Sequence, residues 1–208
     1  MSIFRRIGVF ILDIIETLVM ALAVFVIVYL FLFQPHQVRG SSMYPNFHDG
    51  EYILTDKFSY RLGLPKRGDV IVFRAPRNEE YDYIKRIIGL PGDSIQLENG
   101  QVFVNSQILD EYYLPKDFVT SAGAFIKLGQ AVTVPNDQYF VLGDNRSHSS
   151  DSREWGFVPK ENIIGKAWFR YWPPDRFGAI QKIEYKSLTD KALKYFFKPL
   201  LSFHQAPL

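Results

Sequence analysis

The longest uninterrupted apolar stretch of the chain lies near its N-terminus. Thr17–Phe33 contains no charged residue and no helix-breaking residue, and a further apolar segment, Ile7–Ile15, precedes it. Together they reach the length of about 20 residues that a helix needs to cross the roughly 30 Å hydrocarbon core of a bilayer. The pattern predicts a transmembrane helix that ends by Pro35, with residues 1–34 forming a cytoplasmic N-terminus and anchor.

A cleaved signal peptide is the alternative interpretation of this stretch. The apolar region of a signal peptide has about 7–15 residues and ends at a small-x-small site. Here the apolar stretch is longer and runs into Gln34–Val38, which offers no such site, so we expect an uncleaved anchor. Arg5 and Arg6 precede the helix and only Arg39 follows it closely. The positive-inside rule therefore predicts a single-pass protein of the plasma or inner membrane, with the N-terminus in the cytoplasm and the rest outside.

After the anchor, the pattern changes to short apolar or alternating runs separated by turn signals. Such runs are typical of antiparallel strands, and no alternating helices are present to support a parallel sheet. Glu98-Asn99-Gly100-Gln101 lies between two alternating runs and is a strong signal for a two-residue hairpin. The sequence predicts a mostly β fold with one antiparallel β domain over residues 35–175. The predicted strands are Tyr52–Thr55, Val70–Phe73, Tyr81–Leu90, Ser94–Leu97, Val102–Val104, Ala131–Val134, Tyr139–Leu142 and Ile163–Tyr171.

Residues 176–208 are predicted to form a basic and aromatic C-terminal tail. Within it, Lys182–Phe203 has the pattern of a short amphipathic helix that breaks at Pro199. Two interpretations remain open. One is a terminal helix that packs on the domain or stays poorly ordered. The other is a helix that contacts the membrane surface, because Lys and aromatic residues alternate near an anchored domain.

Composition narrows the classes of function. The 208 residues include 24 Lys and Arg and 22 Asp and Glu, which gives a formal net charge of +2. No stripe of Lys or Arg is present, so nucleic acid is not an expected partner. The chain has no cysteine, which excludes a disulfide framework, a thiolate metal site and a cysteine nucleophile.

A serine and a lysine are the candidate catalytic groups. Ser42 lies in a Ser-Met-Tyr-Pro turn soon after the anchor, and Lys85 lies inside an apolar, strand-like run. A serine hydroxyl needs a proton acceptor before it attacks a carbonyl. The ordinary pKa of lysine is ~10.4, and lowering it to ~7–8 takes about 3–5 kcal/mol, which burial can supply. Arg86 follows Lys85 and must point to the opposite face. We expect one of the two to face the core and the other to face outward, and alternation does not choose between them.

A third segment is dense in small hydroxyl and ionic groups. Gly143–Arg153 directly follows the apolar run Tyr139–Leu142. So many polar groups at a strand exit favour a hydrogen-bonded loop, with a solvated polar turn as the alternative.

Four motifs follow one another along the chain, and they are Gly40–Pro45, Arg67–Phe73, Tyr83–Asp93 and Gly143–Gly156. Together they resemble the type I signal peptidases, the membrane-anchored Ser/Lys endopeptidases of family S26. The resemblance runs from the anchor to about Trp172. By this resemblance the fold is the compact, single-anchor form without the large extra β domain that many members carry.

The resemblance also implies roles for individual residues. It makes Ser42 the nucleophile, Lys85 the general base and Ser149 a serine that orients the lysine by a hydrogen bond. The backbone N–H of Ser42 would help to form the oxyanion hole. Gly40 stands where some members have a second oxyanion serine, which leaves the hole to backbone donors and water. The remaining matches are the ion pairs Arg86–Asp144 and Arg153–Asp151, and the residues lining shallow pockets for small side chains, Val38, Met43, Tyr83 and Ile84.

Two places depart from the family pattern. Asn46-Phe47 stands where the family commonly has Thr-Leu, and Ser147-His148 stands where it has Asp-Asn. The second change puts His148 next to Ser149. A histidine base is therefore an alternative to Lys85, although the family uses none.

The expected function is hydrolysis of exported preproteins after small-x-small residues, which releases their signal peptides through an acyl-enzyme. We expect the substrate to lie extended along a strand edge. The expected partners are exported preproteins and membrane lipid, and no metal or cofactor is implied. Two alternatives remain. One is a related Ser/Lys peptidase with a narrow substrate set, as in pilin processing or an organelle inner membrane. The other is a catalytically silent, anchored β module that binds exported peptides.

Overall fold

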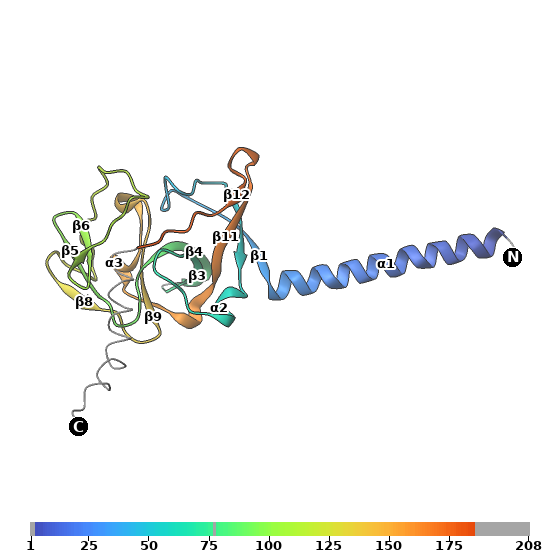
Figure 1. The fold of residues 1–208 in the computed structure, drawn as a ribbon, viewed down its shortest axis with the longest axis horizontal. Coiled ribbons are helices and arrows are strands. Elements are labelled where there is room, and N and C mark those ends of the chain that lie inside the picture. The colour runs from blue at the N-terminus through green and yellow to red at the C-terminus, as the bar shows by residue number, and fades with distance from the viewer. Residues whose placement is uncertain (1–2, 77, 186–208) are drawn as a thin grey trace, which may run out of the picture.

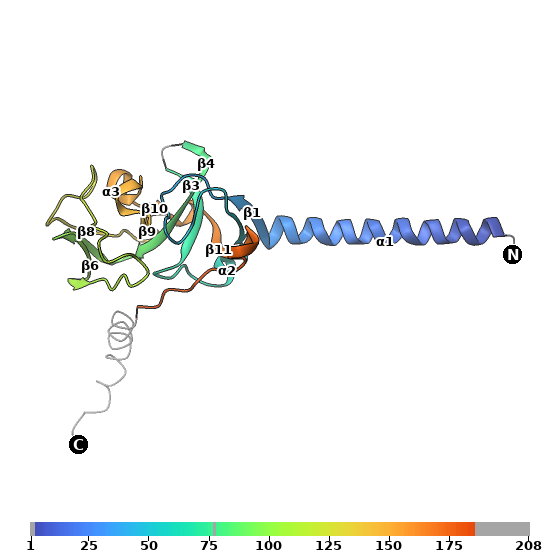
Figure 2. The same cartoon turned by 90° about the horizontal axis from the view of Figure 1, so that it is seen from above.

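The computed structural model describes residues 3–76 and 78–185, which form a long helix and a β domain (Figure 1, Figure 2). Helix α1, Ile3–Phe31, projects from the domain and leaves its apolar side chains exposed. Its segment Arg6–Tyr29 is long and apolar enough to cross a membrane, and none of its most apolar stretch is buried against the domain. The helix leads almost directly into strand β1, Phe33–Gln37, so the site that follows β1 lies close to the end of this candidate membrane span.

The larger sheet has eight strands, all paired in antiparallel fashion, in the order β1-β2-β11-β3-β4-β9-β10 with β12 paired to β11. β4 lies between β3 and β9, but only its last residues, Arg86 to Gly89, pair with β9. This arrangement leaves one edge of the first part of β4 without a strand partner in the described part of the chain. The bounds are β2 Tyr52–Asp56, β3 Val70–Ala75, β4 Asn78–Gly89, β9 Gln138–Leu142, β10 Val158–Pro159, β11 Ile163–Trp172 and β12 Gly178–Ala179.

The smaller sheet has four antiparallel strands in the order β7-β6-β5-β8. β5 and β6 form the predicted hairpin: Glu98 pairs with Gln101, and Asn99 and Gly100 have positive φ angles of 49° and 76°, as a type I′ turn requires. The bounds are β5 Ser94–Glu98, β6 Gln101–Val104, β7 Gln107–Ile108 and β8 Ala131–Thr133. The short helical elements are α2 Ser59–Leu62, α3 Ser152–Trp155, and the single turns η1 Arg146–His148, η2 Lys160–Asn162 and η3 Pro174–Arg176.

Buried apolar side chains form three clusters. The first joins the smaller sheet to β4 and β9 and includes Ile95 and Phe140. The second packs the loop after β1 against β2, β3 and β11 and includes Phe47. The third lies around β3, β4 and β9 and includes Ile71 and Ile87. Because burial of apolar surface is the main favourable term in folding, these clusters fix both the loop after β1 and strand β4.

The structure confirms the mostly antiparallel β fold, and all eight predicted strands are present with ends shifted by a few residues at most. The predicted strands begin only at Tyr52, whereas the structure has strand β1 directly after the anchor helix. Pro35 lies inside this strand and faces Leu54 of β2. Proline is tolerated because, among the described residues, β1 is an edge strand that pairs with β2 alone.

Residues after β12 run back along the domain. Ile183 and Tyr185 are buried in the first cluster, although residues 176–208 are predicted as a tail. The predicted amphipathic helix over Lys182–Phe203 falls almost entirely outside the described residues.

Candidate active site

Ser42 lies in a loop between β1 and β2 whose two sides are tied together by the backbone. Val38 N donates to Glu51 O at 2.8 Å, and Gly50 N donates to Val38 O at 2.9 Å. These bonds extend the pairing of β1 with β2 beyond the strands themselves. The serine is therefore carried on a closed loop rather than on a free connection.

The residues around the serine fix the shape of this loop. Met43 and Phe47 are each 1% exposed and insert into the second cluster. Gly40 has a φ of +81°, in the left-handed region that glycine adopts readily, and its N–H donates to Asp49 Oδ1 at 2.7 Å. The positive φ is a local structural reason for glycine at this position, and the predicted role of Gly40 in the site stays a prediction.

Lys85, on β4, contacts the serine. Its Nζ donates hydrogen bonds to Ser42 Oγ at 2.8 Å and to Ile84 O at 2.9 Å. Burial lowers the pKa of Lys85 to about 8, although the negative charges of Asp151 and Asp144 act in the opposite direction. A pKa near 8 leaves about a tenth of the amines neutral at pH 7. The amine can therefore accept a proton from the serine hydroxyl near neutral pH.

The expectation that only one of Lys85 and Arg86 faces the interior is wrong, because both are buried, at 4% and 3% exposed. They point to opposite faces of β4, and the long loop between β7 and β8 covers the face of Arg86. Tyr113 of that loop places its ring centroid 4.3 Å from Arg86 Cζ. Asp144 accepts hydrogen bonds from Arg86 Nε at 2.8 Å and Nη2 at 2.6 Å. This paired counter-charge allows the guanidinium to be buried.

The loop after β9 is tied to the loop that carries the serine. Asn145 N donates to Ser42 O and Asn145 Nδ2 donates to Ser41 O, both at 3.0 Å. Within the same loop, Arg153 Nε and Nη2 bond the two carboxylate oxygens of Asp151 at 2.8 and 2.9 Å. The segments predicted to carry the serine, the lysine and the polar loop therefore meet in one place.

Ser149 lies in this loop, and its hydroxyl oxygen is buried with no hydrogen-bond partner among the residues that the structure describes. A hydrogen bond from Ser149 to Lys85 is thus not formed here, and the orienting role stays a prediction. The loop packs closely on the serine: a Cβ at Gly143 would lie 2.1 Å from Ser149 Oγ and 2.5 Å from Ser42 O. Only glycine at 143 permits this approach.

The four residues predicted to line pockets fall into two groups. Val38 and Met43 are buried in the second cluster, and Ile84 packs against that cluster half-buried. Tyr83 packs against the third cluster, because successive strand residues point to opposite faces. It shares a face with Lys85, whose Nζ lies 5.4 Å from the centroid of the Tyr83 ring.

His148, the alternative base, bonds within its own loop. Its Nδ1 lies 2.8 Å from Ser147 Oγ. Ser42 Oγ is instead bonded to Lys85 Nζ. The geometry favours Lys85 over His148 as the proton acceptor.

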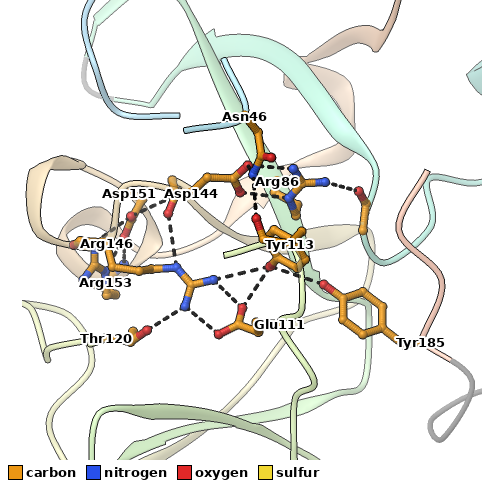
Figure 3. Close-up of polar contacts among 12 residues, drawn as sticks. Asn46, Arg86, Glu111, Tyr113, Thr120, Asp144, Arg146, Asp151, Arg153 and Tyr185 are labelled. Atoms are coloured by element: carbon orange, nitrogen blue, oxygen red, sulfur yellow. Dashed lines mark hydrogen bonds and ion pairs between the residues drawn. The ribbon is translucent and has the colours of Figure 1, made fainter. Parts of the chain in front are cut away.

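Sequence reasoning missed a second buried arginine beside the site. Arg146 is 2% exposed and bonds both carboxylate oxygens of Glu111 and the hydroxyl of Thr120, the latter at 2.6 Å (Figure 3). Its Nε donates to Gly143 O at 3.2 Å. Glu111 precedes Arg146 by 35 residues in a loop without regular periodicity, so no local pattern identifies the pair.

Over residues 3–76 and 78–185, no group of three or more His, Cys, Asp or Glu side chains is arranged to hold a metal ion. The site places the Ser42 hydroxyl next to the Lys85 amine, whose pKa is lowered. Such an amine can take the hydroxyl proton as the oxygen attacks a carbonyl carbon.

Comparison with known proteins places these features in a family. A family model described as "Signal peptidase, peptidase S26" matches residues 11–172. The probable signal peptidase I-2 of Synechocystis sp. is 39% identical over 170 residues, covering 79% of this chain and 75% of that protein. Signal peptidase IB of Staphylococcus aureus (strain COL) is 36% identical over 179 residues, covering 79% of this chain and 93% of that protein. A crystal structure of a signal peptidase I from Enterococcus faecalis matches with a TM-score of 0.41 and 33% identity, covering 50% of this chain and 97% of that one.

Proposed function

Because the chain belongs to the signal peptidase family, peptidase S26, and functions as a signal peptidase, we propose that it cuts exported preproteins with Ser42 as nucleophile and Lys85 as general base. The observation that carries this proposal is the 2.8 Å contact between Lys85 Nζ and Ser42 Oγ. The amine is buried, and its pKa of about 8 makes its neutral form accessible at working pH.

The proposed reaction has two stages. Neutral Lys85 takes the hydroxyl proton as Ser42 Oγ attacks the scissile carbonyl carbon. The lysine then gives that proton to the leaving amine, and the C–N bond breaks to leave an acyl-enzyme. Water, deprotonated by Lys85, attacks the ester, and the proton returns to Ser42 Oγ as the signal peptide leaves.

Two groups are proposed to assist this reaction. The backbone N–H of Ser42 donates to the developing oxyanion, which needs a donor in place before the charge forms. Ser149 rotates to hydrogen-bond Lys85 and orient it. The support for this second role is that Ser149 Oγ is buried beside the serine loop without a partner among the described residues.

The substrate is proposed to bind as an extended strand between β1 and β4. β1 pairs only with β2, and residues of β4 before Arg86 pair only with β3, so the facing edges have free backbone groups in the described part of the chain. His36 Nε2 of β1 lies 3.3 Å from Asp82 Oδ2 of β4, which brings these edges close together. Main-chain pairing at such edges gives affinity, and pockets for alternate side chains give specificity.

The specificity proposed for this slot is small-x-small. Val38 and Met43 lie in the loop that carries the serine, and Ile84 packs against the same apolar cluster, so the proposed pockets are apolar. A shallow apolar pocket accepts alanine and excludes bulky or charged side chains. Tyr83 would contact the substrate from the other face of β4.

The anchor and partners complete the proposal. α1 holds the domain at the membrane lipid with the N-terminus in the cytoplasm and the catalytic domain outside. There the domain meets exported preproteins as their signal peptides emerge. No cofactor is part of the mechanism.

The test is cleavage of a preprotein by the full chain in detergent, with the cut site read by mass spectrometry. Ser42→Ala should abolish cleavage without loss of fold. The matched control, Ser41→Ala, should retain cleavage, because Asn145 bonds the backbone carbonyl of Ser41, which alanine keeps. Full turnover by Ser42→Ala would refute the proposal. Cleavage of one specialised substrate alone would favour the narrow peptidase, and no cleavage of any preprotein by the parent would favour a silent binding module.

A further inference from the structure

Asn46 stands at a junction between the serine loop and the lysine strand. It lies in the same turn as Ser42, and its side-chain amide donates to Asp144 Oδ2 at 2.8 Å and to Tyr113 O at 3.2 Å (Figure 3). The same Asp144 oxygen accepts from Arg86 Nη2 at 2.6 Å. Asn46 therefore links the turn of the nucleophile to an ion pair made by the residue that follows the proposed base.

The link is reciprocated by a second amide. Asn145, next to Asp144, donates from its backbone and its side chain to the carbonyls of Ser42 and Ser41, both at 3.0 Å. Asn46 belongs to the loop that carries Ser42 and donates to the loop after β9. Asn145 belongs to the loop after β9 and donates to the loop that carries Ser42. Two cross-links in opposite directions restrain both the distance and the rotation between these segments, where one alone would leave a hinge.

The junction is enclosed. Tyr113 covers Arg86 with its ring, and its carbonyl oxygen accepts a hydrogen bond from the Asn46 side-chain amide. Asp144 is 1% exposed, so its bonds are made in a region of low dielectric where they are strong and costly to lose.

We propose that Asn46 is a positioning residue that sets the alignment of Ser42 Oγ with Lys85 Nζ. The inference rests on the proposed function, since it assumes that these two groups do the chemistry. Asn46 does not touch the reacting atoms; it acts through Asp144 and Arg86. Misplacement of reacting groups by about 1 Å lowers a rate by ~10²-fold, which is the scale of effect expected here.

The chemistry of the side chain explains why asparagine suits this position. An amide has two N–H donors, and here it donates to two acceptors on different segments. Threonine has one hydroxyl donor and could satisfy only one of them. Leucine has the branched shape of asparagine, is bulkier, and has no donor.

The experiment measures kcat and KM for preprotein cleavage by the full chain in detergent. Asn46→Leu should lower kcat by ~10–100-fold and change KM by less than about twofold, because the dyad is misaligned while the substrate slot is intact. The acidic limb of the pH–rate profile should not move, since no charge is added or removed. Asn46→Thr should lie between Asn46→Leu and the parent. The matched control is Asn136→Leu in the exposed turn before β9, which should behave as the parent does.

Several outcomes would overturn the inference. One is a parent-like kcat in Asn46→Leu. Another is a fall in kcat that is fully accounted for by the fraction of unfolded protein under assay conditions, as measured by urea unfolding, which would indicate a structural role alone. If Asn46→Leu does not fold, Asn46→Thr decides: a reduced kcat in a folded protein supports the inference, and a parent-like kcat contradicts it. Ser42→Ala is run alongside. If it still cleaves, the proposed function and the inference both fail, whereas an inactive Ser42→Ala beside a fully active Asn46→Leu refutes the inference alone.

Discussion

Replacing Lys85 by methionine should abolish cleavage while making the domain more stable at neutral pH. Burial lowers the pKa of Lys85 from 10.5 to about 8. At 1.36 kcal/mol per unit, a difference of this size corresponds to about 3 kcal/mol of unfavourable interaction with the protonated amine. Methionine matches the lysine stem in length and carries no charge, so it removes this unfavourable interaction. It also removes two hydrogen bonds worth about 1 kcal/mol each, so the expected net gain at pH 7 is about 1 kcal/mol.

The pH dependence gives the sharper test. Below pH 8 both the folded and the unfolded chain hold the proton on Lys85, and the full penalty lowers the stability of the parent. As the pH rises from 8 towards 10.5, the folded chain loses the proton first, so the unfolded state binds more protons and the stability of the parent rises. The stability difference between Lys85→Met and the parent should therefore narrow by about 2.5 kcal/mol between pH 7 and pH 10.

The assay is urea unfolding of the full chain in detergent at pH 7, 8, 9 and 10, with preprotein cleavage measured on the same samples. Taking the difference between variant and parent cancels the titration of every other group. The matched control is Lys116→Met, an exposed lysine whose replacement should give a difference independent of pH. A Lys85→Met difference that also stays constant with pH would refute the reasoning, because burial would then not have lowered the pKa of the amine.

Three further predictions follow from the topology, the substrate slot and the close packing of the loop. Added protease should digest the domain in right-side-out vesicles and spare it in inside-out vesicles; the reverse pattern would invert the orientation. A substrate with Ala at the first and third positions before the cut should be cleaved, and a large or charged residue at either should slow cleavage by ~10²-fold, about 3 kcal/mol; equal rates would point to another type of peptidase. Gly143→Ala should lower kcat by ~10²-fold, because its Cβ would lie 2.5 Å from Ser42 O, a backbone atom that must then move; a parent-like kcat would show that the loop shifts without disturbing the serine.

Much of the fold was predictable because its signals are local. Alternation of apolar residues marked the strands, and the Asn99-Gly100 pair marked the hairpin that the structure contains. Strand β1 was not predicted, because Pro35 indicates the end of a helix. Its pairing with β2 becomes visible only in the structure. Which strands lie at a sheet edge depends on how distant segments pair. The alternation of apolar and polar residues along a strand does not show which strand pairs with which.

In the candidate site, too, local motifs could be recognised in the sequence, whereas contacts between distant segments could not. Ser42 and Lys85 were candidates from their motifs, and their catalytic roles stay predictions, although the structure brings the two side chains into contact. Both predicted ion pairs are formed in the structure. The burial of Arg86 was not predicted, since it depends on a loop without periodicity that supplies Tyr113. Asn46 was noted only as a departure from the family pattern. Its role depends on acceptors 98 and 67 residues away in the chain, which no local pattern reveals.

The pH dependence of preprotein cleavage tests the central claim most directly. A lysine base acts when neutral, so kcat/KM should rise with pH through a midpoint near the lowered pKa of Lys85, about 8. Lys85→Ala and Lys85→Arg should both be inactive, since alanine has no base and a guanidinium keeps its proton in this range. His148→Ala should keep most activity with the same midpoint, and Ser149→Ala should retain an intermediate rate. An active Lys85→Ala beside an inactive His148→Ala would contradict the Ser42–Lys85 mechanism.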